Sequence, residues 1–258
     1  MPYLTRDGVK LYYEEAGSGP PMIFIHGWTC DRSHFAPQAA HFAPHYRCLS
    51  VDLRGHGESD KPEQEYTIDG FAADVAWMCG ELGVSGAVLA GHSMGGAIGL
   101  AVAAAHPELC KALVMLDPAI LFPAELLPLI TQLVAGFRSP EGAAVLRQFG
   151  SDQFFVATSD PKLKAQIVDG MMRTPMHVVA SAFEGVTAFD GDAALGAVKM
   201  PVLYVGADPQ IAQIARLAEL CPQAITAKTA VSGHFHQLEV PAQVNAMMDR
   251  FLAAAVPA

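Results

Sequence analysis

The stretch from Gly86 to Ala105 constrains the fold more than any other part of the chain. It begins as an apolar run, breaks at Gly-His-Ser-Met-Gly and continues as a run of small residues. This order predicts a strand, a sharp turn and a helix, with Ser93 at the apex of the turn. Such a turn strains the serine backbone, and the small residues Gly91 and Gly95 leave room for it. The hydroxyl then lies at a helix N-terminus, which favours a developing anion, so we interpret Ser93 as a nucleophile.

The composition indicates one α/β domain with an insertion. The chain has 258 residues, of which 52% are hydrophobic, enough for a large buried core. A net charge of −10 argues against nucleic acid and anionic membranes as partners. The five cysteines are scattered along the chain, and their spacing does not indicate a disulfide framework or a zinc cluster. The first residues lack a signal-peptide core and no segment reaches membrane-spanning length, so we predict a cytoplasmic protein.

Strand and helix patterns alternate along most of the chain, which predicts a mostly parallel sheet flanked by helices. Strands are predicted at 4–14 (a hairpin around Asp7-Gly8), 22–25, 46–51, 86–90, 112–116, 201–205 and 224–227, and helices at 33–42, 67–82, 94–105, 211–220 and 244–255. Between 119 and 198 the strand signal vanishes and prolines separate helical patches. We therefore predict an α/β core at 1–118 and 199–258, with a helical cap insertion at 119–198.

Four motifs follow the predicted strands in a fixed order. They are His26-Gly27-Trp28, Asp52-Leu53-Arg54-Gly55-His56-Gly57-Glu58-Ser59, Gly91-His92-Ser93-Met94-Gly95-Gly96 and Gly233-His234. With these four motifs in this order, the chain resembles the α/β-hydrolase superfamily from end to end. The resemblance implies a mostly parallel eight-stranded sheet, often with one antiparallel strand near its start. It also implies a helical cap after the sixth strand, and ligand binding at the carboxyl ends of the strands.

The resemblance also implies a Ser-His-Asp triad around Ser93. His234, after a glycine that follows the last strand, matches the catalytic base in order and context; His236 is the nearest competitor. Asp208, after the strand at 201–205, lies where many relatives carry the acid, although the loop is one residue shorter here. Asp117, at the end of the sixth strand, is the site that other members use. We favour Asp208.

By the same family logic, an oxyanion at Ser93 is stabilised by the backbone N–H groups of Met94 and Trp28. The indole of Trp28 is then free to wall an acyl pocket or to pack in the core. His234 and His236 form a His-x-His pair, but no third ligand at a suitable spacing accompanies it, so we expect no metal and no cofactor.

The cap insertion is expected to roof the pocket. Its apolar candidates are Phe122, Leu126, Leu127, Leu133, Phe137, Phe154, Phe155, Met171, Met172 and Phe183, and its cations are Arg138, Arg147, Lys162, Lys164 and Arg173. The predicted function is hydrolysis of a small-molecule carboxylic ester or lactone with a hydrophobic acyl or aryl part. The alternatives are a carbon–carbon bond hydrolase, a slow-turnover ligand receptor and a cofactor-free dioxygenase.

Overall fold

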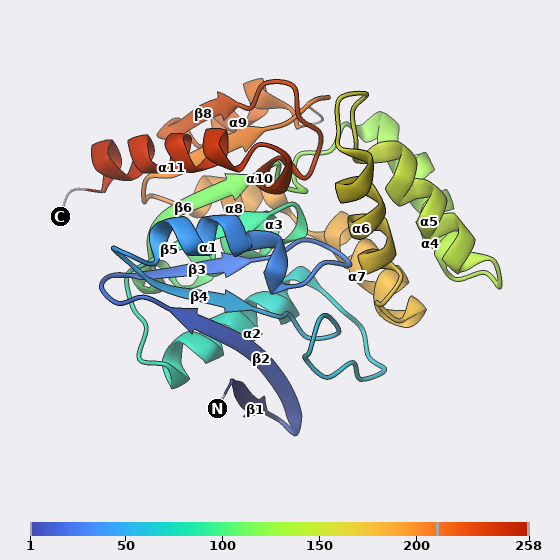
Figure 1. Ribbon diagram of the computed structural model, residues 1–258, viewed down its shortest axis with the longest axis horizontal. Helices are drawn as coiled ribbons and strands as arrows, with labels where there is room; N and C mark the ends of the chain where they lie inside the picture. Colours follow the sequence, from blue (N-terminus) through green and yellow to red (C-terminus); the bar gives the residue numbers. More distant parts are fainter. Residues whose placement is uncertain (1, 210–211, 257–258) are drawn as a thin grey trace.

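An eight-stranded sheet forms the centre of the molecule (Figure 1). The computed structural model describes residues 2–209 and 212–256, apart from the side chains at 124 and 127. The strands are β1 (Tyr3–Arg6), β2 (Val9–Ala16), β3 (Pro21–Ile25), β4 (Arg47–Val51), β5 (Ala87–His92), β6 (Cys110–Leu116), β7 (Val202–Gly206) and β8 (Ala224–Lys228), in the spatial order β1-β2-β4-β3-β5-β6-β7-β8. β2 is antiparallel to β1 and β4, and the other pairs are parallel. The predicted mostly parallel sheet is confirmed.

Helices cover both faces of the sheet, because each buried strand is apolar on both sides. In β3, Met22 and Phe24 belong to one hydrophobic cluster, and Ile23 and Ile25 to the other. The first face packs against α1 (Ala36–Phe42) and α11 (Pro241–Ala255), preceded by η1 (Arg32–Phe35) and α10 (His236–Glu239). The second packs against α2 (Ile68–Glu81) and α3 (Met94–Ala105), with η2 (Pro107–Leu109) before β6. No helix of the described residues is long and apolar enough to cross a membrane.

Most predicted elements are present within a few residues of their predicted bounds. Thr67 caps α2: its hydroxyl accepts the backbone N–H of Gly70 at 3.0 Å. The helix predicted at 211–220 is α9 (Ile214–Leu220), and residue 211 itself lies outside the described residues.

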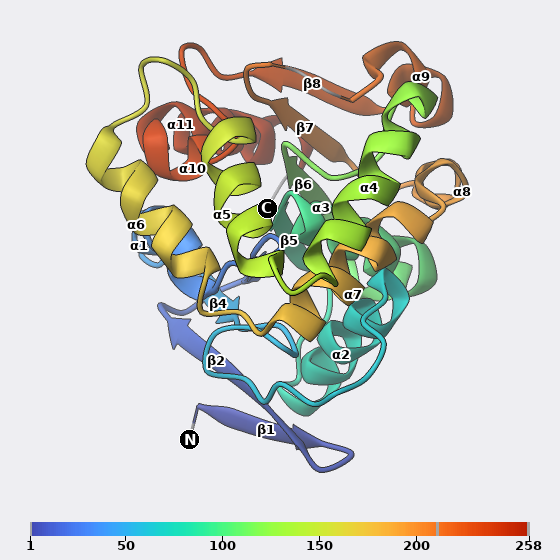
Figure 2. The ribbon, with the colours of Figure 1, turned by 90° about the vertical axis from the view of Figure 1, so that its right-hand side faces the viewer.

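The segment at 119–198 contains helices, and no strand among its described residues. They are η3 (Ala124–Leu126), α4 (Leu127–Phe137), α5 (Gly142–Gln153), α6 (Pro161–Met171), α7 (Met176–Ala188) and α8 (Gly191–Ala197). Helices α4–α7 lie beside the ends toward which β3 and β6 point, and in front of the sheet in the second view (Figures 1 and 2). α8 instead packs on α3 and α9, with the helical layer of the core. We call the four helices α4–α7 and the segments that join them the cap below, and the division into a core and a cap insertion at 119–198 stays a prediction.

Candidate active site

Ser93 sits between β5 and α3 in a strained backbone conformation, with φ 53° and ψ −119°. The turn is tight enough that a side chain at either flanking glycine would collide with backbone. A Cβ at Gly91 would overlap the carbonyl oxygen of Gly95, and one at Gly95 would overlap that of Ile25. The predicted strand–turn–helix around Ser93 is therefore present, with the side chain half-buried at the carboxyl edge of the sheet.

His234 is paired with Asp117 rather than with Asp208. The ring Nδ1 of His234 lies 2.6 Å from the Asp117 Oδ2 carboxylate oxygen, and both side chains are largely buried. Asp117 follows β6, the strand next to β5, and has φ 42°, a conformation that aspartate tolerates better than most residues. The backbone N–H of Ala207 approaches the other oxygen, Oδ1, at 3.4 Å. Our choice of Asp208 as the carboxylate that faces His234 is thus wrong in this structure.

Asp208, after β7, contacts other partners than His234. Its backbone N–H donates to the carbonyl of Ser232 at 3.0 Å, and its carboxylate forms an ion pair with Lys228 at the end of β8. The Asp208 side chain is 43% exposed, against 11% for Asp117. The loop therefore supplies a backbone donor to Asp117, through Ala207, instead of an acid to His234.

Two neighbouring histidines hydrogen-bond to groups other than a carboxylate. The carbonyl of His234 accepts a hydrogen bond from Nε2 of His92 at 2.9 Å, which requires the proton of His92 on Nε2. His236 is fully buried, and its Nδ1 lies 3.0 Å from the hydroxyl of Thr229. Burial lowers the pKa of His236 to about 4. Of the two candidates in the His-x-His pair, His234 is the one that contacts a carboxylate, whereas His236 bonds to the hydroxyl of Thr229.

The backbone groups predicted to bind an oxyanion lie beside Ser93. Met94 is the first residue of α3, so its N–H has no acceptor within the helix. The loop after β3 passes close by: a Cβ added at Gly27 would lie 3.2 Å from the Cβ of Ser93. Trp28 follows Gly27 directly. The oxyanion role of these two N–H groups stays a prediction.

The indole of Trp28 joins the core to the cap. Its Nε1 donates to the carbonyl of Val179 on α7 at 2.9 Å, and the side chain is 6% exposed. The ring centroid lies 5.3 Å from that of Phe137, 6.1 Å from that of Phe149 and 4.9 Å from that of Phe183. Trp28 therefore packs in an aromatic cluster made mostly by the cap, directly after the loop that faces Ser93.

The cap residues proposed as pocket lining divide into two groups. Phe137 and Met171 are 1% exposed and form the core of the cap. The half-buried members are Phe122, Leu126, Leu133, Phe154, Phe155, Met172 and Phe183, and the side chain of Leu127 lies outside the described part. Sequence reasoning missed Phe149, whose position three residues after the buried Leu146 places it on the inward face of α5.

The arginines of the cap are engaged in ion pairs at the surface. Arg138 pairs with Glu184 at 2.5 Å, Arg147 with Asp169 at 2.8 Å and Arg173 with Asp31 at 3.4 Å. Lys162 is exposed, and Lys164 lies over the ring of Phe155 at 5.5 Å. None of these contacts directs a cation of the cap toward Ser93.

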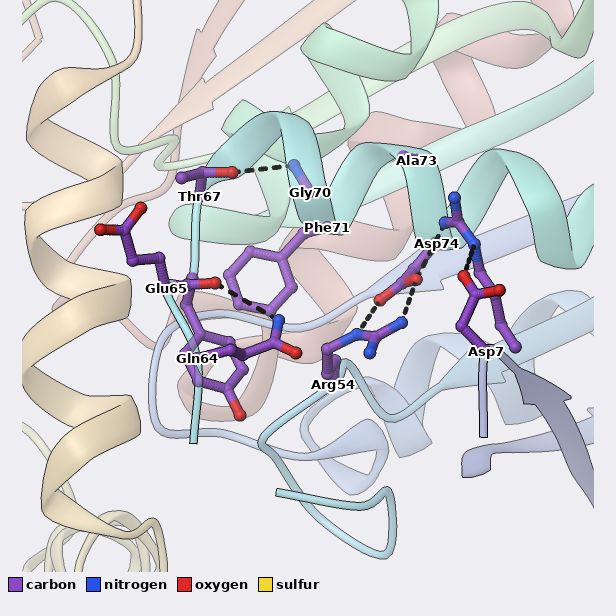
Figure 3. Close-up of a pocket in the computed structure, with 11 residues that line it drawn as sticks. Asp7, Arg54, Gln64, Glu65, Thr67, Gly70, Phe71, Ala73 and Asp74 are labelled. Carbon is purple, nitrogen blue, oxygen red and sulfur yellow. Dashed lines mark hydrogen bonds and ion pairs between the residues drawn. The ribbon is translucent and has the colours of Figure 1, made fainter. Parts of the chain in front are cut away.

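A separate cavity of about 190 Å³ lies at the start of α2 (Figure 3). Its charged groups are largely satisfied by one another: Arg54 pairs with Asp74 through two nitrogens at 2.7 and 2.8 Å, and Arg6 reaches the same carboxylate at 2.9 Å. Neither Ser93 nor His234 lines this cavity, so we assign it a structural role in fixing β1 and the loop after β4 against α2.

Four buried histidines predict that the protein loses stability in mild acid. Burial lowers the pKa of His26 to about 4, that of His56 to about 3 and that of His236 to about 4, and holds that of His92 well below its usual value. Each of these histidines takes up a proton on unfolding below pH 6.5. Its contribution to the free energy of unfolding is therefore complete above that pH and is lost as the pH falls. The loss approaches about 1.4 kcal/mol per pH unit for each histidine as the pH falls well below 6.5.

Urea unfolding at a series of pH values between 6.5 and 5 measures this loss before the carboxyl groups titrate. His34 does not counteract this loss of stability. Burial lowers the pKa of His34, but Cys30 and Asp31 raise it by more than burial lowers it, to about 10. The contribution of His34 to stability is therefore already complete below pH 6.5. His236→Gln should give a shallower slope than the wild type. A free energy of unfolding that stays constant over this range contradicts the prediction.

Comparison with known proteins gives one family. The family model described as alpha/beta hydrolase fold matches residues 20–241. The AB hydrolase superfamily protein YisY of Bacillus subtilis is 30% identical over 267 residues, covering 96% of this chain and 97% of that protein. A non-heme haloperoxidase of Rhodococcus erythropolis is 32% identical, covering 85% and 86%. The enol-lactonase of Burkholderia xenovorans LB400 has a TM-score of 0.88 at 25% identity, covering 98% and 100%. Est816, an N-acyl homoserine lactone degrading enzyme, has a TM-score of 0.85 at 26% identity, covering 97% and 100%.

Proposed function

The chain belongs to the alpha/beta hydrolase family, and we propose that it is a serine hydrolase that cleaves a carboxylic ester or lactone by acyl transfer. The observation that carries the proposal is the 2.6 Å contact between Nδ1 of His234 and Asp117, at the same edge of the sheet as the strained Ser93. A hydroxyl needs a neighbouring base to act as a nucleophile, and the base needs an anion that fixes its tautomer.

In the proposed mechanism Ser93 attacks the carbonyl carbon of the substrate while Nε2 of His234 takes its proton. Asp117 holds the other ring nitrogen, Nδ1, and stabilises the imidazolium that forms. The backbone N–H groups of Met94 and Trp28 bind the oxyanion. His234 then returns the proton to the leaving oxygen, which gives an acyl-enzyme. Water, deprotonated by the same histidine, releases the acid and restores Ser93.

The acyl or aryl part of the substrate is proposed to be apolar and uncharged. The cap presents aromatic rings around Trp28, and Phe154 stacks on the ring of His234. The arginines of the cap are already neutralised by carboxylates. The likeness to an enol-lactonase and to an N-acyl homoserine lactone degrading enzyme supports a lactone or ester as the bond that is cleaved. Five free, buried cysteines are compatible with a reducing, cytoplasmic location.

The test is hydrolysis of p-nitrophenyl esters of increasing acyl length, together with labelling by a fluorophosphonate. We expect labelling at Ser93 in a 1:1 ratio, a burst of p-nitrophenol and turnover that reaches an optimum at one chain length. The optimum measures the length of the pocket under the cap. Absence of labelling at Ser93 would contradict the assembled triad.

Two other results would favour the alternatives. Labelling without turnover of any ester or lactone would favour a carbon–carbon bond hydrolase or a slow-turnover receptor. Both of these alternatives need the same assembled triad, so both would still be labelled at Ser93. Oxygen consumption that survives Ser93→Ala would favour a cofactor-free dioxygenase, because only the histidine–aspartate pair is then needed.

A further inference from the structure

A short segment of the cap lies directly on the turn that carries His234. This segment, residues 154–160 between α5 and α6, is called the cap linker below. The backbone N–H of His234 donates to the carbonyl oxygen of Phe154 at 2.8 Å, and a Cβ added at Gly233 would lie 2.5 Å from that same oxygen. The ring of Phe154 stacks on that of His234, with centroids 4.8 Å apart and an interplanar angle of 24°. The proposed base thus touches the cap through both backbone and side chain.

Glu239, the last residue of α10, binds both segments with one carboxylate. Its Oε1 accepts the backbone N–H of Gly233 at 3.1 Å, and its Oε2 accepts the hydroxyl of Ser159 at 2.6 Å. The oxygen of Ser159 in turn accepts the backbone N–H of Val156 at 3.0 Å. Hydrogen bonds to a carboxylate are stronger than those between neutral groups, so we expect the two bonds to Glu239 to hold the two segments together more strongly than two neutral bonds would.

We propose that Glu239 is a positioning residue for His234, which it holds in place by clamping the cap linker onto the histidine turn. The inference rests on the proposed function, since it concerns the base of that reaction. The backbone of His234 is held by a bond from its N–H to Phe154 and a bond to its carbonyl from His92. When the cap linker lifts, the first bond is lost and the ring loses its stacking partner. The position of the cap linker and the orientation of His234 are therefore coupled through Glu239.

Hydrogen exchange tests the clamp without any substrate. We compare the wild type with Glu239→Ala and Ser159→Ala, and use Glu219→Ala as the control, because Glu219 is an exposed glutamate that pairs with Arg216 on α9. Both clamp variants should exchange faster in the cap linker and in residues 233–235 together, while the control stays at the wild-type rate. Glu239→Gln keeps one acceptor oxygen and should lie between wild type and Glu239→Ala, and it replaces the alanine variant if that variant does not fold.

Ester hydrolysis then tests the positioning role. A small displacement of a catalytic group costs up to about 100-fold in rate, so Glu239→Ala should lower kcat about 10-fold and change KM far less. Ser159→Ala should act in the same direction, and adding it to Glu239→Ala should cause no further loss, since both substitutions break one connection. Glu239→Gln should recover part of kcat.

The possible failures are separable. Wild-type exchange at residues 233–235 in Glu239→Ala would overturn the clamp whether or not the enzyme hydrolyses esters. Faster exchange with an unchanged kcat would overturn the positioning role. If the wild type shows no Ser93-dependent hydrolysis, the proposed function fails, and the exchange experiment still decides whether Glu239 joins the two segments.

Discussion

Ser93→Ala should lower kcat for ester hydrolysis by about 10⁶-fold, to the residual rate that substrate binding and the oxyanion donors provide. The substitution removes the oxygen that attacks the substrate in the acylation step of the proposed mechanism. The fold should survive, because alanine keeps the Cβ of Ser93 in a turn where its flanking glycines, not its hydroxyl, relieve the crowding. The measurement is burst and steady-state release of p-nitrophenol, with thermal unfolding recorded on the same sample.

A matched control is Ser85→Ala, which removes an exposed hydroxyl at the opposite end of β5 and should leave kcat unchanged. His234→Ala should cost about as much as Ser93→Ala, and the double variant should be no worse than either, because the two side chains act as a unit. A burst of normal amplitude in Ser93→Ala would remove the serine from the mechanism altogether.

The positions of the strands along the chain and the position of Ser93 were predictable because their signals are local. Glycines on both sides of Ser93, an apolar run before it and a small-residue run after it specify strand, turn and helix within about twenty residues. The alternation in β3, where Met22 and Phe24 face one helical layer and Ile23 and Ile25 the other, is equally local. These features depend on neighbours in the sequence, so the sequence alone carries them.

The partner of His234 was not predictable in the same way, since three segments far apart in the chain decide it. The sequence places Asp117 and Asp208 alike after buried strands. In the structure the Asp208 carboxylate pairs with Lys228 at the end of β8, and the N–H of Ala207 approaches Asp117. The shortened loop after Gly206 was the one visible sign.

The residues that join the cap to the core were hidden for the same reason. Glu239 lies in a four-residue helix without any motif, and its importance appears only when Ser159 and Gly233 are seen on its two oxygens. Trp28 was recognisable as part of a motif, but the sequence did not decide whether its indole lines the pocket or packs in the core. Its bond to Val179 on α7 shows a third role, that of tether to the cap.

Asp117→Asn should lower kcat by about 10⁴-fold, whereas Asp208→Asn should change it by no more than a few-fold. An asparagine that keeps its amide N–H toward Nδ1 selects the wrong tautomer of His234, so Nε2 carries the proton and cannot act as base. Asp208 forms an ion pair with Lys228 that is largely exposed, and such pairs contribute little. The two variants are matched, because each replaces one carboxylate by an isosteric amide after adjacent strands.

Both variants are measured with the ester that the wild type hydrolyses fastest, alongside the rate of fluorophosphonate labelling. Labelling should slow in Asp117→Asn by a similar factor, because acylation of Ser93 needs the same histidine, and should be normal in Asp208→Asn. The opposite ranking would mean that the loop after β7 rearranges in solution and brings Asp208 to His234. That rearrangement would have to break the Lys228 ion pair and the bond from the Asp208 N–H to Ser232, so Lys228→Ala should then raise activity. With Asp117 as the acid, Lys228→Ala leaves activity unchanged.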